Sequence, residues 1–412
     1  MRDKTSPKIR FPGFSEEWKQ MKLGEVVEIK DSARISNTLW VSKGVPYLRS
    51  SDLANDEIVG ELFISDETYQ SYKDKTGAPQ KDDVLFTSGG KIGVTYHKTD
   101  DNPVYVQGGS ILYAKTSTSN KLNGIYLNAF FSSPTMTKYI EGASTGLTIK
   151  HFTLKPANAA PIFISSLKEQ NKIGEFFKQI DETIAFHQQE LTILKQTKEG
   201  FLQKMFPKEG ESVPEVRFPG FTGSWEERKL KELAEFSKGN GYSKSDLTDK
   251  GKPVILYGRL YTRYETVIES VDTFTIEKEK SVISKGNEVI IPSSGETSKD
   301  ISRASVVSKP GVILGGDLNI IRPSNGIDPV FLALTISNGR QQKELSKRAQ
   351  GKSIVHLHNS DLKEINLIFP GKEEQIKIGN LFNGFDRAIA LHQRELDTLK
   401  ETKKAFLQKM FA

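Results

Sequence analysis

EQNKIGEFFKQIDETIAFHQQELTILKQTKEGFLQKMF, residues 169–206, returns as EQIKIGNLFNGFDRAIALHQRELDTLKETKKAFLQKMF, residues 374–411. The two copies are identical at 23 of 38 positions, at a constant offset of 205. Neither copy contains proline, and residues that favour helices (Gln, Glu, Lys and Leu) dominate both. Apolar residues alternate at spacings of four and three, as at Ile173, Phe177, Ile180 and Ile184. This heptad pattern predicts two long helices that form a coiled coil.

Two positions on the apolar face of each predicted helix are polar. They are His187 and Lys198 in the first copy, and His392 and Lys403 in the second. One interpretation is that they are hydrated positions where the seam frays or splays. The other is that they fix the register and the partner of the helix at some cost in stability. No metal site is expected at the histidines, because the chain has no cysteine and no carboxylate cluster shares the seam.

The repetition extends beyond the helices. Residues 7–14, PKIRFPGF, match residues 214–221, PEVRFPGF, at an offset of 207, and Trp18 then matches Trp225. The offset is still 207 at residues 108–109 and has become 205 by Gly146, which matches Gly351. The chain therefore consists of two copies of a unit of about 200 residues, each a globular part followed by a long helix.

The globular parts contain short β-type runs between clusters of Gly, Asn, Asp and Ser. These runs lie at 45–48, 83–87, 104–106, 111–114, 289–291, 312–314 and 318–321, and helical patterns lie at 124–131 and 328–337. The predicted fold class is α+β: two strand-rich globular domains separated by two long antiparallel coiled-coil helices, with a pseudo-two-fold internal repeat. The expected bounds are 1–165 for the first domain, 166–206 for the first helix, 207–213 for a linker, 214–369 for the second domain and 370–412 for the second helix.

Composition excludes several classes of protein. Zero cysteines exclude disulfides and thiolate chemistry, and fit a reducing cytoplasm. No apolar run reaches the roughly 18 residues of a membrane span, and no signal peptide is visible, so no membrane partner is expected. The formal net charge of +6 is compatible with nucleic acid but too small to indicate it alone.

The doubled order of motifs resembles the specificity (S) subunit of a type I restriction–modification enzyme. The motifs are Arg-Phe-Pro-Gly-Phe at 10–14 and 217–221, the two tryptophans that follow, Lys-Asp-Asp-Val-Leu-Phe-Thr-Ser-Gly-Gly-Lys-Ile-Gly at 81–93, and Glu-Gln-x-Lys-Ile-Gly at 169–174 and 374–379. The resemblance covers essentially the whole chain. One departure is the second Gly-containing loop, Pro292–Ser298, which lacks the Gly-Lys-Ile-Gly of the first, so the equivalence of the two loops is open.

This resemblance implies two target-recognition domains, each reading one half of a bipartite, asymmetric DNA site. The paired helices would set the unread gap and dock two adenine-methyltransferase (M) subunits. Restriction (R) subunits would join this core. The resemblance implies no cofactor in this chain, with S-adenosylmethionine, ATP and Mg²⁺ on the partner subunits. It also implies a prokaryotic cytoplasmic location.

Base edges are read by side chains, whereas phosphate contacts position a protein on DNA. Basic and aromatic residues in polar loops are therefore the candidate DNA contacts, and the alternative for each is an ordinary solvated charge or core aromatic. The candidates are Arg34, Tyr47, Arg49, Lys91, His97, Lys98, Lys150, His151, Arg259, Tyr261, Arg263, Tyr264, Lys299, Arg303, Lys352 and His356.

No catalytic motif is recognisable. Residues 102–105, Asn-Pro-Val-Tyr, lack the second proline of the tetrad that holds the target amine in adenine methyltransferases. Residues 88–93 lack the Gly-x4-Gly-Lys-Ser/Thr pattern of a phosphate loop, and His356 and His358 have no evident third metal ligand. We expect a non-catalytic subunit. The alternatives are a scaffold with no DNA role and a self-sufficient enzyme with an unrecognised site.

Overall fold

The computed structural model describes residues 7–54, 57–58, 60–146, 150–349 and 355–411. The chain folds into two compact units, which are described separately. Unit 1 comprises Met1–His187 and Glu395–Ala412, and unit 2 comprises Gln188–Arg394. Each unit therefore contains part of both long helices, α6 (Leu167–Lys204) and α12 (Lys372–Met410). The mixture of strands and long helices confirms the predicted α+β class.

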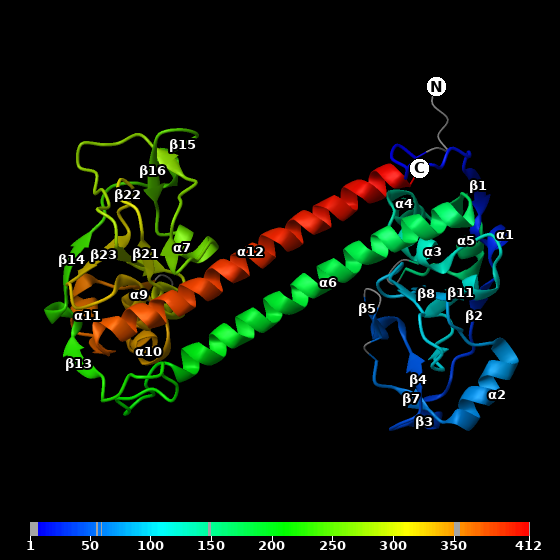
Figure 1. Ribbon diagram of the computed structural model, residues 1–412, viewed down its shortest axis with the longest axis horizontal. Coiled ribbons are helices and arrows are strands. Elements are labelled where there is room, and N and C mark those ends of the chain that lie inside the picture. Colours follow the sequence, from blue (N-terminus) through cyan, green and yellow to red (C-terminus); the bar gives the residue numbers. More distant parts are fainter. Residues whose placement is uncertain (1–6, 55–56, 59, 147–149, 350–354, 412) are drawn as a thin grey trace. The chain divides into compact units, whose positions relative to one another are not determined.

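Unit 1 contains two four-stranded sheets (Figure 1). One sheet has the order β2-β11-β8-β9 and is antiparallel throughout, and the other has the order β10-β4-β7-β3 with a parallel β10–β4 pair. The strands are β1 Lys19–Lys22, β2 Ile29–Asp31, β3 Trp40–Val41, β4 Val45–Leu48, β5 Leu53–Ala54, β6 Glu57–Ile58, β7 Phe63–Ile64, β8 Val84–Thr87, β9 Thr95–His97, β10 Tyr105–Val106, β11 Ile111–Ala114 and β12 Pro161–Ile164. The short helices are α1 Leu23–Val26, α2 Asp66–Thr76, α3 Gly124–Phe131, α4 Pro134–Ala143 and α5 Leu154–Ala159.

Unit 2 has a five-stranded sheet of order β14-β23-β19-β21-β17 and a four-stranded sheet of order β15-β18-β16-β22. The strands are β13 Glu226–Lys229, β14 Ala234–Lys238, β15 Leu247–Thr248, β16 Lys252–Ile255, β17 Val267–Ile268, β18 Phe274–Thr275, β19 Glu288–Pro292, β20 Ser294–Gly295, β21 Ser305–Val307, β22 Ile313–Leu314, β23 Leu318–Pro323, β24 Val355–His356 and β25 Asn366–Phe369. The short helices are α7 Arg259–Thr262, α8 Ser298–Ile301, α9 Pro329–Ser337, α10 Gly339–Arg348 and α11 Asn359–Lys363.

The internal repeat is visible in equivalent local structures. Asn123 caps α3 by accepting hydrogen bonds from two backbone N–H groups, and Asp328, at the offset of 205, caps α9 in the same way. The pairing of β1 with β12 starts at Lys19 opposite Ile164, and that of β13 with β25 at Glu226 opposite Phe369. Both units therefore fold on one plan, as the sequence repeat predicts.

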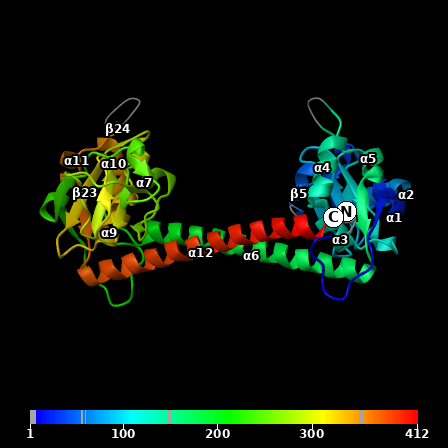
Figure 2. The same ribbon diagram turned by 90° about the horizontal axis from the view of Figure 1, so that it is seen from above.

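In each unit the segments of α6 and α12 pair antiparallel. In unit 1 the ring of Phe177 stacks on Phe411 at 5.5 Å, and Phe176 meets Phe406 edge-on at 5.0 Å. Both views show this end of α12 (red) beside the start of α6 (Figures 1 and 2). In unit 2, Phe201 packs against Phe385 and Phe206 against Phe382. The predicted apolar seam is therefore formed in both units.

The polar residues of the seam form ion pairs. Lys198 pairs with Asp386 in unit 2, and Lys403 pairs with Asp181 in unit 1. The two pairs are equivalent at the offset of 205. In one pair the lysine comes from α6 and the aspartate from α12, and in the other pair the lysine comes from α12 and the aspartate from α6. Of the two interpretations left open by the sequence, these reciprocal pairs favour a role in fixing register. His187 Nδ1 lies 3.4 Å from Glu395 Oε2 in unit 1.

The repeated motifs join each globular part to the helices. Arg10 donates two hydrogen bonds to Glu169 near the start of α6, and Arg217 does the same to Glu374 in α12. The adjacent backbone N–H of Ile9 donates to Lys409 O in the last turn of α12. The next residue of the helix motif, Gln170, hydrogen-bonds three backbone groups of unit 1. These motifs therefore serve the architecture of the units.

Among the described residues, no helix combines the length and the apolar character that crossing a membrane requires.

Candidate nucleic-acid interface

The Gly-rich loop of unit 1, residues 88–93, follows β8, and the side chain of Thr87 forms hydrogen bonds across it. The Thr87 hydroxyl donates to Lys91 O at 2.5 Å and accepts from the Val94 N–H at 3.0 Å. Gly90 and Gly93 have φ values of +69° and +83°, which only glycine adopts readily. The loop therefore turns tightly and leaves the Lys91 side chain exposed.

A second loop, which ends at His151, lies against the Gly-rich loop. Gly89 and His151 form a β-bridge, and the Phe152 N–H donates to Ser88 O at 2.8 Å. A Cβ on Gly89 would lie 3.2 Å from His151 Nδ1, so the absence of a side chain permits this approach. His151 and the preceding Lys150 are exposed. The two loops thus bring three candidate DNA contacts, Lys91, Lys150 and His151, to one part of unit 1.

Unit 2 forms the same loop pair with different residues. β20 pairs with β24, with Ser294 opposite His356, and the Leu357 N–H donates to Ser293 O as the Phe152 N–H does to Ser88 O. The structure aligns Gly89 with Ser294 and His151 with His356, each 205 residues apart, although the offset is 207 at residues 108–109. The structure therefore establishes the backbone equivalence of the two loops that the sequence left open, although their side chains differ.

The loop surface of unit 1 continues into a hollow of about 580 Å³. Arg34, Trp40, Arg49 and Gln107 are among the residues that line it. Arg49 precedes Ser50, and a Cβ on Gly90 would lie 3.3 Å from Ser50 Oγ, so the hollow adjoins the Gly-rich loop. Three of the predicted residues, Lys91, Lys150 and His151, therefore lie in the loop pair, and two more, Arg34 and Arg49, line the hollow that adjoins it.

Three other predicted residues of unit 1 are buried. Tyr47 lies beneath the hollow with its hydroxyl accepting from the Ile35 N–H at 3.1 Å, and burial raises its pKa. His97 and Lys98 lie at the opposite end of the β8–β9 pair from the Gly-rich loop. The Lys98 ammonium donates to Asp100 Oδ1 at 2.7 Å and lowers the pKa of that carboxyl. All three side chains are engaged in contacts within the unit.

In unit 2, several predicted residues surround β20 and α8. The Tyr261 hydroxyl donates to Ser294 O at 2.5 Å, and burial raises its pKa. Arg303 pairs with Asp300 of α8 at 3.1 Å, and its guanidinium lies 5.7 Å from the ring centroid of Tyr264. Arg303 and the exposed His356 form the counterpart of the loop surface in unit 1, whereas the hydroxyls of Tyr261 and Tyr264 are bonded within the unit.

Arg259 and Arg263 are tied to carboxylates beside α7. Arg259 pairs with Glu265 at 2.7 Å and Asp272 at 2.6 Å, and Arg263 pairs with Asp272 at 2.7 Å. The Lys299 side chain and all of Lys352 lie outside the described residues. Whether any of the sixteen residues contacts DNA stays a prediction.

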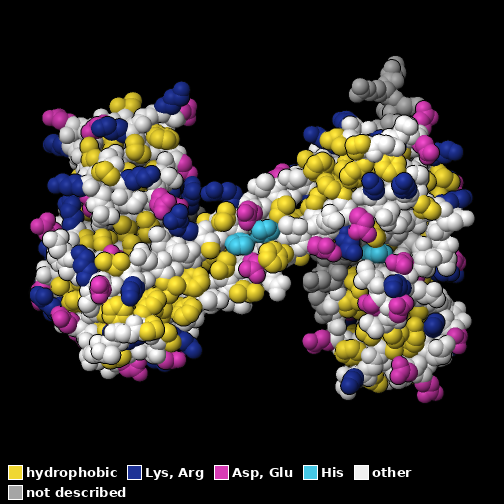
Figure 3. Space-filling model, in the orientation of Figure 1, with side chains coloured by type: hydrophobic (Ala, Val, Ile, Leu, Met, Phe, Trp, Pro, Cys, Tyr) yellow, Lys and Arg dark blue, Asp and Glu magenta, His cyan; other side chains and the backbone are white. Residues whose placement is uncertain are grey.

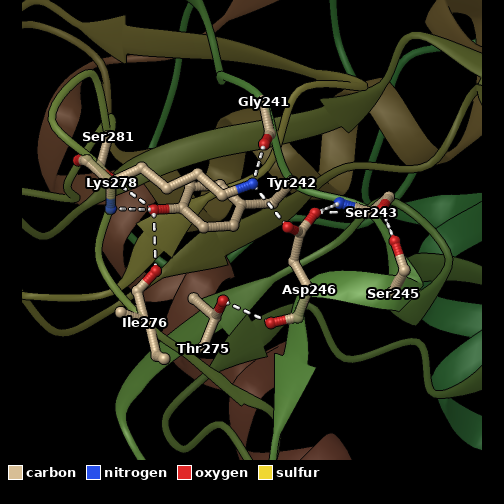
Figure 4. Close-up of polar contacts among 9 residues, drawn as sticks. All are labelled: Gly241, Tyr242, Ser243, Ser245, Asp246, Thr275, Ile276, Lys278 and Ser281. Carbon is tan, nitrogen blue, oxygen red and sulfur yellow. Dashed lines mark hydrogen bonds and ion pairs between the residues drawn. The ribbon is translucent and has the colours of Figure 1, made fainter.

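A second polar cluster in unit 2 ties two loops together (Figure 4). The Lys278 ammonium lies 4.7 Å from the Tyr242 ring centroid and donates to Asp246 Oδ1 at 2.6 Å. The hydrogen bond from Lys278 lowers the pKa of Asp246 to about 2. The Tyr242 hydroxyl contacts Ser281 Oγ at 2.5 Å and accepts from the Lys278 N–H at 2.7 Å. Lys278 is thus engaged by a carboxylate, as Arg49 is by Asp52 in the hollow of unit 1, whereas Arg34 of that hollow contacts the neutral amide of Gln107.

Sequence reasoning missed Trp40 and Gln107 in the hollow. Trp40 is a tryptophan between Leu39 and Val41, which was a usable signal, whereas nothing in the sequence connects Gln107 to Arg34. On the face seen in Figure 3, Lys and Arg side chains are interspersed with Asp and Glu, in keeping with the modest net charge. Local side-chain arrangements therefore distinguish the loop surfaces better than bulk charge does.

Comparison with known proteins gives one consistent result. Residues 15–196 and 223–401 match the family described as "Type I restriction modification DNA specificity domain". The MjaVIII specificity subunit of a type I restriction enzyme from Methanocaldococcus jannaschii is 23% identical over 305 residues, 71% of each chain. The MjaIX specificity subunit from the same organism is 20% identical and covers 96% of this chain and 92% of its own. The crystal structure of a type I restriction–modification S subunit from M. genitalium has a TM-score of 0.67 at 16% identity, and the match covers 99% of both chains.

Proposed function

This chain belongs to the family of type I restriction–modification DNA specificity proteins, and we propose that its two units read the two halves of a bipartite, asymmetric DNA site. The observation that carries this proposal is the loop pair, built on the same hydrogen bonds in both units but with different side chains. Because all duplex DNA has a similar shape, two loops with the same backbone can be positioned on it in the same way. Because base edges are read by side chains, loops with different side chains can read different sequences.

On this proposal, side chains of the loop surfaces contact the DNA and read its sequence. In unit 1 these surfaces carry the exposed Lys91, Lys150 and His151 beside the two arginines of the hollow. In unit 2 they carry His356 and Arg303. Exposed cations supply the phosphate contacts that make binding salt-dependent, and guanidinium and imidazole groups supply donors to base edges.

The long helices on this proposal set the number of unread base pairs between half-sites. Each helix rises about 1.5 Å per residue, whereas duplex DNA rises about 3.4 Å per base pair. The ion pairs of the seam, Lys198 with Asp386 and Lys403 with Asp181, would hold the register on which the gap depends. A change in helix length should therefore change the number of base pairs between the two half-sites.

The helices also supply the surface on which two M subunits dock. Phe186 and Leu391, equivalent at the offset of 205, are 56% and 51% exposed, so each long helix presents a large apolar side chain at the same point of the repeat. Because the internal repeat places an equivalent exposed apolar side chain on both helices, these two positions fit two copies of the same partner. R subunits join this core. The catalytic steps, with S-adenosylmethionine, ATP and Mg²⁺, belong to the M and R subunits, and this chain supplies specificity.

The direct test uses this chain co-purified with its M subunit and a library of duplex DNA. We expect selection of one split sequence, with affinity that falls steeply as salt rises. Co-purification without sequence selection would instead identify a scaffold. Methyl transfer by this chain without M would show that the chemistry resides here.

A further inference from the structure

Two arginines, Arg34 and Arg49, line the hollow of unit 1, and each guanidinium group is held by hydrogen bonds to another side chain of the unit. With the Gln107 amide oxygen turned toward Arg34, it accepts hydrogen bonds from Nε and Nη2 of Arg34, both at 2.7 Å. Arg49 donates from Nε and Nη2 to the carboxylate of Asp52, both at 3.0 Å. Among the described residues, Nη1 of neither arginine has a hydrogen-bond partner. Both donors are therefore oriented before any ligand arrives.

The supporting groups of Arg49 are themselves fixed. Asp52 is buried and also accepts from the Arg49 N–H at 2.8 Å and the Ser51 hydroxyl at 3.1 Å. Asp52 therefore balances the charge of Arg49, and Arg34, which is held by the neutral Gln107 amide, gives the hollow its positive character. A side chain whose orientation is fixed by a second layer of hydrogen bonds reads its ligand more selectively than a flexible one.

One wall of the hollow is aromatic. Trp40 is 37% exposed and lies 6.2 Å from the ring of the buried Tyr47, which in turn stacks on Tyr105 at 6.3 Å. The indole is therefore packed against a buried ring on one side and still presents a surface to a ligand. Two oriented donors beside a flat apolar wall match a purine better than a bare phosphate, which needs no such wall.

We propose that this hollow recognises a guanine in the half-site read by unit 1, an inference that rests on the proposed function. Guanine presents two acceptors, O6 and N7, in the major groove and is the commonest base partner of arginine. Adenine and cytosine each present an amino donor there, which would face the guanidinium donors unfavourably.

Unit 2 has no equivalent of this arrangement among its described residues. At the offset of 207, Arg34, Trp40 and Arg49 correspond to Gly241, Leu247 and Leu256. The neighbouring cation Lys278 is already bound by Asp246 and Gly241 O (Figure 4). The guanine contact inferred from Arg34 and Arg49 is therefore assigned to the half-site read by unit 1.

The test compares Arg34→Ala and Arg34→Lys with the wild-type chain, each co-expressed with the M subunit, by mapping methylated sites across the host genome. Lys43→Ala is the matched control, an exposed cation of the same unit that does not line the hollow. We expect both Arg34 variants to lose discrimination for guanine at one position of one half-site, by about tenfold or more, with the other half-site unchanged. Lys keeps the charge but not the planar fork of arginine, so it does not restore the preference.

Two results would overturn the inference. One is a uniform loss of methylation at every site that Arg34→Lys restores, which identifies a phosphate contact. The other is an unchanged motif. Co-purification of each variant with M reports whether it is folded. If the wild-type chain itself yields no split motif, the proposed function has failed; if it does and only the Arg34 result differs, the guanine inference alone has failed.

Discussion

The guanidinium of Arg10 forms two hydrogen bonds of 2.8 Å with the carboxylate of Glu169, whose side chain is 1% exposed. The Trp18 indole N–H donates to the same carboxylate at 3.0 Å. Without the Arg10 cation, the buried carboxylate of Glu169 would be an unpaired charge, which would lower the stability of the fold. This contact connects the N-terminal motif to the start of α6.

We therefore predict that Arg10→Ala lowers the free energy of unfolding of unit 1 by about 3 kcal/mol. Chemical denaturation followed by tryptophan fluorescence measures this change. Arg10→Ala combined with Glu169→Gln removes the stranded charge and should recover part of the loss. A loss below about 1 kcal/mol in the single variant would show that the pair is dispensable.

The ion pair between Lys403 and Asp181 should couple the two helices in unit 1. Because both side chains are partly exposed, we predict a coupling free energy of about 0.5–1 kcal/mol in a double-mutant cycle of Lys403→Ala and Asp181→Ala. The coupling should shrink as salt rises. Lys198 and Asp386 form the matched cycle in unit 2. Additive effects in both cycles would contradict a role in fixing register.

Asp246 predicts a specific acid response of unit 2. Its pKa is lowered from 3.8 to about 2, chiefly by the hydrogen bond from Lys278. A carboxyl with a depressed folded-state pKa stabilises the protein above its unfolded pKa, and this contribution is lost as pH falls through the folded value. The difference in melting temperature between wild type and Asp246→Asn should therefore be constant above about pH 5 and shrink toward pH 2. A difference that is the same at pH 6 and pH 3 would contradict this assignment.

Helix length should determine the gap between the half-sites. Inserting one heptad after Gln189 in α6 and another after Arg394 in α12, which are equivalent at the offset of 205, preserves the apolar seam. Seven residues add about 10 Å, the rise of about three base pairs. We predict a methylated motif with unchanged half-sites and a gap altered by up to about three base pairs. The same gap in the variant would remove the spacer role.

The long helices were predictable because their signals are local and repeated. Heptad spacing and the absence of proline indicate a helix at 166–206, and the structure has α6 at Leu167–Lys204. Short buried strands were also found where an apolar run is bounded by polar clusters, as at Val45–Leu48 and Ile111–Ala114. Sheet order was not predictable, since the parallel pairing of β4 with β10 joins residues far apart in the chain.

The candidate site was only partly predictable for the same reason. Arg34 and Arg49 stood out as basic residues in loops, but their common hollow depends on Gln107, which the β4–β10 pairing brings near Arg49. His97 and Lys98 resemble exposed loop residues in the sequence, yet both are buried. A buried lysine that pairs with a carboxylate two residues further on, as Lys98 does with Asp100, cannot be distinguished from a solvated lysine without the fold.

The most direct test of the central claim is a genome-wide map of adenine methylation in cells that carry this chain with its M subunit, compared with cells that lack this chain. We predict a split motif that appears only when this chain is present, with one methylated adenine in each half-site on opposite strands. A continuous motif, or an unchanged methylation map despite co-purification with M, would contradict two DNA readers on one chain.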